Sequence, residues 1–234
     1  MEKMNSIKPL MRQVRHSLSY ERSLPIIHND QRSSMNIVDV GIEMAEAQRR
    51  LAPYKNNITV FGSARVKRAD PLFQDAYQLA KELSDDGYNI LTGAGPGIMK
   101  AANKGAYEGK SKSIGLNIEL PHEQSANPYL DECLTFEHFF SRKVMLVKHA
   151  RACVYFPGGY GTADELMEVL TLVQTQKMRP IPLILYGIDY WKPLLSWFEQ
   201  LAEDGYIDHQ DLMLMHVVDS TDEIIQIIKE SVCH

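Results

Sequence analysis

The chain has 234 residues, of which 44% are hydrophobic and 24% are charged, and these proportions are ordinary for a globular protein with one substantial core. A formal net charge of -5 gives no general electrostatic reason to bind DNA, RNA or an anionic membrane, so none of these is predicted as a partner. Three cysteines without a CxxC pair argue against a disulfide scaffold and favour the reducing cytoplasm.

Residues 1–35 differ in composition from the rest of the chain. They carry six Lys or Arg residues against three acidic residues, with little hydrophobic periodicity, so we expect a flexible arm that is extended or disordered. Residues 36–51 place apolar side chains at helical spacing, and we expect this helix to pack on the sheet or on a second subunit. Residues 36–234 are predicted to form a single domain. No apolar run approaches the roughly 20 residues that a membrane span needs.

From residue 58 onwards, short apolar runs alternate with longer amphipathic patterns. The predicted strands cover 58–61, 88–91, 114–118, 134–136, 152–156, 182–186 and 216–218. The predicted helices cover 71–86, 98–109, 139–150, 190–203 and 221–232, and another begins at the glycine turn after residue 156. This alternation predicts an α/β fold: a Rossmann-like, doubly wound parallel sheet with helices on both faces. In such sheets, ligands bind beyond the carboxyl ends of the strands, where the winding reverses direction.

Three glycines stand where the predicted strand 152–156 turns into a helix, in the stretch Pro157–Glu165. The bare N–H groups of such a turn and the positive end of the helix dipole together bind anions without a basic side chain. Glycine also lets the main chain approach a ligand closely. The turn therefore predicts a phosphate site.

Two other turns leave strands at the same edge of the predicted sheet. Ser63 follows the first strand, and its hydroxyl either donates to the same phosphate or stabilises a local turn. The glycine-rich turn 93–97 follows the second strand, but it matches neither the dinucleotide fingerprint nor a P-loop. It is either a plain turn or a second contact to the phosphate.

Two carboxylates, Asp164 and Glu165, follow the glycine turn closely, although a bound phosphate would repel them. One interpretation is a capping box, in which Thr162 caps the helix and Glu165 bonds back to the Thr162 backbone N–H. The other is that Glu165 turns toward the sugar or base of a nucleotide and does chemistry there. Apolar neighbours would raise its pKa, which suits a general acid or base. Glu168, one helical turn further on, is expected to be structural or to support Glu165.

A basic pair, Arg142 and Lys143, belongs to the predicted helix 139–150, which ends just before the strand that feeds the glycine turn. The pair is either solvated surface or faces the ligand, and an arginine fork there suits a phosphate or a carboxylate partner. The eight histidines show no metal-binding spacing. We predict neither a metal ion nor a cofactor.

Pro157–Glu165 matches the signature P-G-G-x-G-T-x-x-E, and Arg142 and Lys143 stand where an arginine-lysine pair precedes it. In these motifs the chain resembles the LOG (Lonely Guy) family over residues 55–220; bacterial members of this family were often labelled "lysine decarboxylase". Characterised members are phosphoribohydrolases, which cleave the N-glycosidic bond of nucleoside 5′-monophosphates and release the free base and ribose 5-phosphate. They belong to cytokinin biosynthesis and form homodimers.

The resemblance implies a role for each motif residue. Arg142 and Glu165 correspond to the catalytic pair, with Lys143, Asp164 and Glu168 as support. The phosphate would be held by Gly158, Gly159, Gly161 and Thr162, with Ser63 and Gly95 nearby. It further implies a nucleoside monophosphate substrate, no cofactor, and a homodimer or higher homo-oligomer.

The segment before Arg142 and the turn 93–97 both depart from the sequences of cytokinin-activating members, and both changes reshape the base pocket. The expected substrate is therefore an AMP-like nucleotide, a pyrimidine nucleotide or a cytokinin ribotide. A lysine decarboxylase is not expected, because nothing in the sequence places a lysine and a pyridinium partner for pyridoxal phosphate. The alternative is a non-catalytic nucleotide-binding or cofactor-carrier protein, which needs the phosphate turn but not both Arg142 and Glu165.

Overall fold

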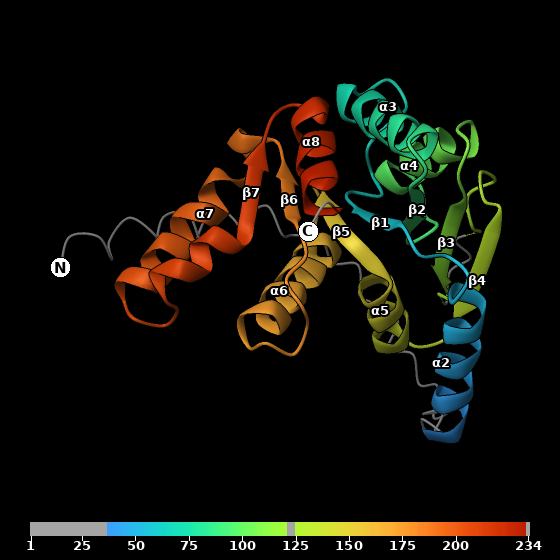
Figure 1. Ribbon diagram of the computed structural model, residues 1–234, viewed down its shortest axis with the longest axis horizontal. Helices are drawn as coiled ribbons and strands as arrows, with labels where there is room; N and C mark the ends of the chain where they lie inside the picture. The colour runs from blue at the N-terminus through green and yellow to red at the C-terminus, as the bar shows by residue number, and fades with distance from the viewer. Residues whose placement is uncertain (1–36, 121–124, 233–234) are drawn as a thin grey trace, which may run out of the picture. The chain divides into compact units, whose positions relative to one another are not determined.

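The computed structural model describes residues 37–120 and 125–232 (Figure 1). The predicted N-terminal arm, 1–35, lies outside the described residues. The described part of the chain belongs to one compact unit, Ile37–His234. Within that described part, no helix is long and apolar enough to cross a membrane.

Seven strands form one sheet in the order β4-β3-β2-β1-β5-β6-β7, and every neighbouring pair is parallel. The strands are β1 (Asn57–Phe61), β2 (Asn89–Thr92), β3 (Ser113–Ile118), β4 (Glu132–Phe136), β5 (Ala150–Tyr155), β6 (Leu183–Tyr186) and β7 (Met215–Val218). The helices are α2 (Ile37–Leu51), α3 (Pro71–Asp85), α4 (Ile98–Tyr107), α5 (Phe139–Lys148), α6 (Tyr160–Gln174), α7 (Ile188–Glu203) and α8 (Thr221–Val232). The predicted α/β fold is confirmed.

The inner strands are buried on both faces, because helices cover each side of the sheet (Figure 1), whereas the edge strands β4 and β7 are partly exposed. Helices α2, α5, α6 and α7 pack on one face, and α3, α4 and α8 pack on the other. In β5, Cys153 and Tyr155 point toward the first group while Ala152 and Val154 point toward the second. This double burial explains why the strand sequences are continuous apolar runs rather than alternating ones.

The first predicted helix, α2, packs on the same face of the sheet as α5. Its Ala47 and Leu51 are buried in that core, whereas Ile37 and Ile42 are exposed. A short 3-10 helix, η2 (His209–Leu214), was not predicted. It is fixed locally by a capping box between Asp208 and Asp211.

The winding of the sheet reverses at β1, which pairs with β2 on one side and with β5 on the other. The turns that follow β1 and β5 therefore lie together at the carboxyl edge. Two hydrogen bonds join them: Phe156 N–H donates to the Phe61 carbonyl at 2.9 Å, and Ser63 N–H donates to the Pro157 carbonyl at 3.0 Å. The predicted ligand position coincides with this junction.

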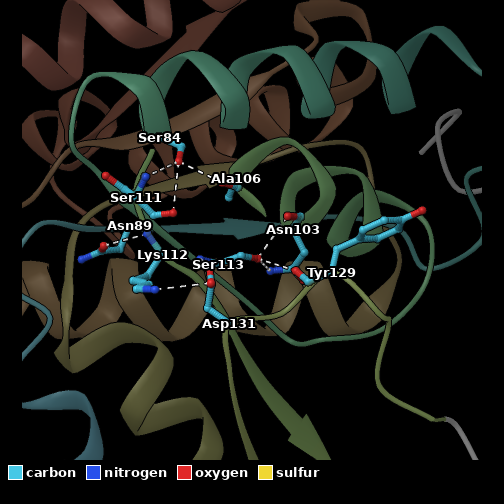
Figure 2. Close-up of polar contacts among 9 residues, drawn as sticks. All are labelled: Ser84, Asn89, Asn103, Ala106, Ser111, Lys112, Ser113, Tyr129 and Asp131. Carbon is cyan, nitrogen blue, oxygen red and sulfur yellow. Dashed lines mark hydrogen bonds and ion pairs between the residues drawn. The ribbon is translucent and has the colours of Figure 1, made fainter. Parts of the chain in front are cut away.

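Polar contacts of Ser113 and Asn103 hold the segment before β4 (Figure 2), and Asn127 extends this network to the turn after β2. The Ser113 hydroxyl donates to the Tyr129 carbonyl at 2.6 Å and accepts from the Asn103 amide at 3.0 Å. Asn127 donates to Asn103 Oδ1 at 2.9 Å, and its backbone N–H donates to the Ala94 carbonyl at 2.8 Å. Since these groups are buried, their mutual hydrogen bonds avoid a desolvation cost and fix the path of this turn.

Candidate active site

A cleft of about 980 Å³ opens at the junction of the β1 and β5 turns. This volume lies within the usual range for small-molecule sites. The cleft is lined by the β1 turn (61–66), Gly93, Met99, Phe139, Arg142, Leu146, the β5 turn and first turn of α6 (157–165), and Tyr190. Residues distant in sequence thus meet in one hollow.

The glycine turn forms the amino-terminal end of α6. Gly159 occupies the N-cap position and no side chain caps the helix, so its first N–H groups have no side-chain partner. A side chain on Gly159 or Gly161 would meet no atom within 4 Å, so both positions are open. On Gly158 a Cβ would lie 2.1 Å from Thr162 Oγ1, so only glycine fits there. This geometry suits a bound anion.

The predicted capping box is wrong. The cap position belongs to Gly159 rather than to Thr162, and Thr162 is buried against Gly158 instead. Among the residues that the structure describes, Glu165 Oε2 is buried and has no hydrogen-bond partner. Glu165 therefore does not act as part of a helix cap.

The pKa of Glu165 is raised to about 7, primarily because the carboxyl is buried. The charges of Lys143 and Arg142 oppose this rise, whereas those of Glu168 and Asp164 add to it. A buried carboxyl that titrates near neutral pH, lines a cleft and lacks a partner has the properties of a general acid or base.

Arg142 is fixed beside this carboxyl by main-chain carbonyls. Its Nε donates to the Leu116 carbonyl at 2.6 Å, and its Nη2 donates to the Gly93 carbonyl at 3.0 Å. Burial lowers the pKa of the guanidinium, and the charge of Glu165 partly offsets that effect. Arg142 therefore acts on Glu165 through its charge, while its hydrogen bonds hold its side chain at the cleft wall.

The remaining predicted residues divide into two groups. Ser63 lines the cleft, and its hydroxyl accepts from the Arg65 N–H at 3.1 Å, as in a local turn. Gly95 is buried outside the cleft lining, and its carbonyl accepts from Asn127 at 3.2 Å. Lys143 and Glu168 also lie outside the lining, where Lys143 bridges α5 and α6.

Several cleft residues were missed in the sequence. The Tyr190 hydroxyl, from the first turn of α7, donates a short hydrogen bond to the Gly158 carbonyl. Phe139 is 61% exposed and Tyr160 is 98% exposed, so the cleft has an aromatic wall that solvent reaches. Phe139 is the first residue of the basic helix α5, and Tyr160 lies within the signature. Those two positions were the signals that the sequence offered. For Tyr190 no motif pointed to the site.

Within residues 37–120 and 125–232, no group of three or more His, Cys, Asp or Glu side chains is placed to hold a metal ion.

A parallel sheet with helices on both faces and a glycine turn at its switch point defines the class of Rossmann-like α/β proteins. Within this class, a family model described as possible lysine decarboxylase matches residues 99–228. The chain belongs to this family, the LOG family.

The relatives named for activity are plant enzymes. A probable cytokinin riboside 5′-monophosphate phosphoribohydrolase of Oryza sativa subsp. japonica is 29% identical over 178 residues, which are 74% of this chain and 76% of the relative. A cytokinin riboside 5′-monophosphate phosphoribohydrolase of Arabidopsis thaliana is 29% identical over 184 residues, or 76% of this chain and 84% of the relative.

The fold is also similar to that of a protein named for a different role. The molybdenum cofactor carrier protein of Chlamydomonas reinhardtii superposes with a TM-score of 0.57 at 23% identity, over 77% of this chain and 99% of that one. At this identity the likeness describes the fold alone.

Proposed function

We propose that this protein hydrolyses the N-glycosidic bond of a nucleoside 5′-monophosphate and releases the free base and ribose 5-phosphate. The observation that carries the proposal is a pair of side chains in the cleft. Within the described residues, Glu165 Oε2 is buried and has no hydrogen-bond partner, and the Arg142 guanidinium is fixed by two main-chain carbonyls. The names of the relatives, which are phosphoribohydrolases, support the same reaction.

The 5′-phosphate would bind at the amino-terminal end of α6. Uncapped N–H groups and the helix dipole attract the anion there, and the open faces of Gly159 and Gly161 allow close approach. Because the phosphate does not react, its binding energy orients the ribose toward the carboxyl. Asp164 also lines the cleft, but its ion pair with Lys143 offsets its charge there.

Cleavage of the C1′–N bond develops positive charge on the ribose, and its electron pair passes to the base. The carboxylate form of Glu165 would stabilise that charge and accept a proton from the water that attacks C1′. The proton then reaches the departing base nitrogen, which balances the reaction. Arg142, held at the wall of the cleft, would contact the substrate and favour the carboxylate form through its charge.

The base would lie against the apolar part of the cleft, which includes Phe139 and Met99. These side chains offer stacking and apolar contact, which purine, pyrimidine and cytokinin bases all accept. The base preference is therefore to be measured. On the family resemblance we also expect a homodimer or higher homo-oligomer, which sedimentation measures directly.

The test is to incubate the purified full-length protein with a panel of purine, pyrimidine and cytokinin 5′-monophosphates and to assay free base and ribose 5-phosphate. We expect at least one to be cleaved. Glu165→Gln should abolish turnover and leave nucleotide binding intact, whereas the matched exposed variant Glu203→Gln should behave as the wild type. If no monophosphate is cleaved while nucleotide still binds, the proposal is wrong.

That last outcome would favour the alternative, a carrier of a nucleotide or phosphorylated cofactor. The uncapped turn alone suffices for such a protein, and the cleft volume also suits a ligand larger than a nucleotide. The two functions are separated by whether any monophosphate is cleaved and whether Glu165→Gln abolishes that cleavage.

A further inference from the structure

One cation bridges two helices of the site without lining the cleft. The Lys143 ammonium lies 2.7 Å from Asp164 Oδ2 and 3.0 Å from Glu168 Oε2, and only 17% of the Lys143 side chain is exposed. Lys143 directly follows Arg142 in α5. Its two partners flank Glu165 in α6, one residue before it and three residues after it. The ion pairs thus tie the helix that carries Arg142 to the helix that carries Glu165.

This arrangement places three carboxylates within one helical turn. Without a cation, like charges at such spacing would repel and would favour the protonated form of each group. Lys143 pairs with two of the three, Asp164 and Glu168. Burial lowers the pKa of Lys143, but the hydrogen bond to Asp164 and the charges of Glu165, Glu168 and Asp164 outweigh it, so its pKa is raised. It therefore stays cationic.

Other titratable groups face Glu165 as well. Arg142, on α5, adds positive charge. From β5, Cys153 and Tyr155 are fully buried, and burial raises the pKa of Cys153 to about 12 and that of Tyr155 well above 10. Both are neutral near pH 7. Apart from Arg142, the only cation acting on Glu165 within the described residues is thus Lys143.

We propose that Lys143 is a positioning residue: by neutralising Asp164 and Glu168 and holding α5 against α6, it keeps Glu165 in the carboxylate form that the proposed hydrolysis requires, an inference that rests on that proposed function. Lys143 does not touch the substrate. Its effect reaches the reaction through the ionisation of Glu165 and through the placement of Arg142 opposite it.

The first experiment compares pH profiles of kcat/KM for the wild type and Lys143→Met. We expect the midpoint of the rising limb to move upward by about one pH unit, the lower end of the usual effect of a close opposite charge. Lys143→Arg, which keeps the charge, should restore most of the wild-type midpoint. Lys148→Met is the matched control, because Lys148 is an exposed lysine of the same helix, and its midpoint should not move.

The second variant keeps Lys143 and removes the acidic charges. Asp164→Asn with Glu168→Gln should lower the midpoint, since Glu165 then loses two like charges and retains Lys143. This variant leaves no carboxylate at positions 164 and 168 without its cation, so it tests the proposal even if Lys143→Met folds poorly. An unchanged or raised midpoint in this double variant would overturn the proposal.

A third measurement separates this inference from the proposed function. The Glu165 carboxyl is titrated by carbon NMR in the wild type and in Lys143→Met, which needs no turnover. A titration midpoint that does not rise in Lys143→Met overturns the role of Lys143, whatever the activity. If the midpoint rises but the wild type cleaves no monophosphate, the proposed hydrolysis fails and the electrostatic role alone stands.

Discussion

Arg142 Nη2 donates to the Gly93 carbonyl at 3.0 Å, and a Cβ on residue 93 would lie 2.0 Å from that same nitrogen. The turn after β2 therefore needs glycine here in order to admit the guanidinium. This turn contributes to the site by placing the Arg142 side chain.

Gly93→Ala should displace Arg142 while leaving the fold intact. Because a misplacement of about 1 Å in a catalytic group can cost about 100-fold in rate, we expect kcat/KM to fall by about that factor. The control is Gly41→Ala in α2, where an added Cβ meets nothing within 4 Å. Activity in Gly93→Ala equal to that of the control would contradict the placement role.

The rate should rise with pH. Since the pKa of Glu165 is about 7 and its carboxylate form is the one proposed to act, kcat/KM should increase through a midpoint near pH 7. The second pKa of the substrate phosphate is about 6. Binding of ribose 5-phosphate is therefore measured over the same pH range, which separates titration of the phosphate from titration of Glu165. A rate that falls through pH 7 would instead assign Glu165 the role of a general acid.

Glu165→Gln should change stability in a pH-dependent way. The pKa of Glu165 is raised from 4.5 to about 7 on folding, so the native state binds its proton more tightly. The contribution of Glu165 to the free energy of unfolding of the wild type is therefore fully present below pH 4.5, and it is lost as the pH rises through 7. Relative to the wild type, Glu165→Gln should gain about 2 to 3 kcal/mol in free energy of unfolding between pH 5 and pH 8.

Urea unfolding at both pH values measures this gain, with Glu203→Gln as the exposed control. A constant difference between Glu165→Gln and the wild type would mean that Glu165 is not perturbed by burial.

Tyr190→Phe should weaken phosphate binding with little effect on the chemical step. The variant loses the hydrogen bond from the hydroxyl to the Gly158 carbonyl, which fixes the turn. One hydrogen bond contributes about 1 kcal/mol, so we expect KM and the dissociation constant for ribose 5-phosphate to rise about fivefold. Tyr206→Phe, an exposed tyrosine outside the cleft, is the control. A fall in kcat at unchanged KM would argue against this role.

Much of the fold followed from local patterns in the sequence. Each predicted strand lies within two residues of an observed one, because double burial gives long apolar runs such as 152–156. The glycine turn was likewise predictable from the local sequence, because three glycines before a helix have few alternative structures. The capping box failed because the same spacing, Thr162 to Glu165, also occurs when the threonine is buried against Gly158.

The hydrogen-bond partners of the site residues could not be predicted from local sequence patterns. Arg142 bonds to Leu116 and Gly93, which are far from it in sequence and adjacent only through the order of the strands. The contact from Tyr190 depends on how α7 begins after β6. Gly95 lies in the turn after β2 but outside the cleft lining, and its carbonyl accepts from the Asn127 amide. Such contacts are tertiary, and no local pattern encodes them.

The two hydrogen bonds that join the β1 and β5 turns extend the sheet past the ends of its strands. The floor of the cleft is thus assembled when the chain folds, before any ligand arrives. A ligand that enters meets turns whose backbone is already ordered, so little of its binding energy is consumed in ordering them. Phe139 and Tyr160, whose side chains are exposed at the cleft, keep the rotamer freedom to adjust around a ligand.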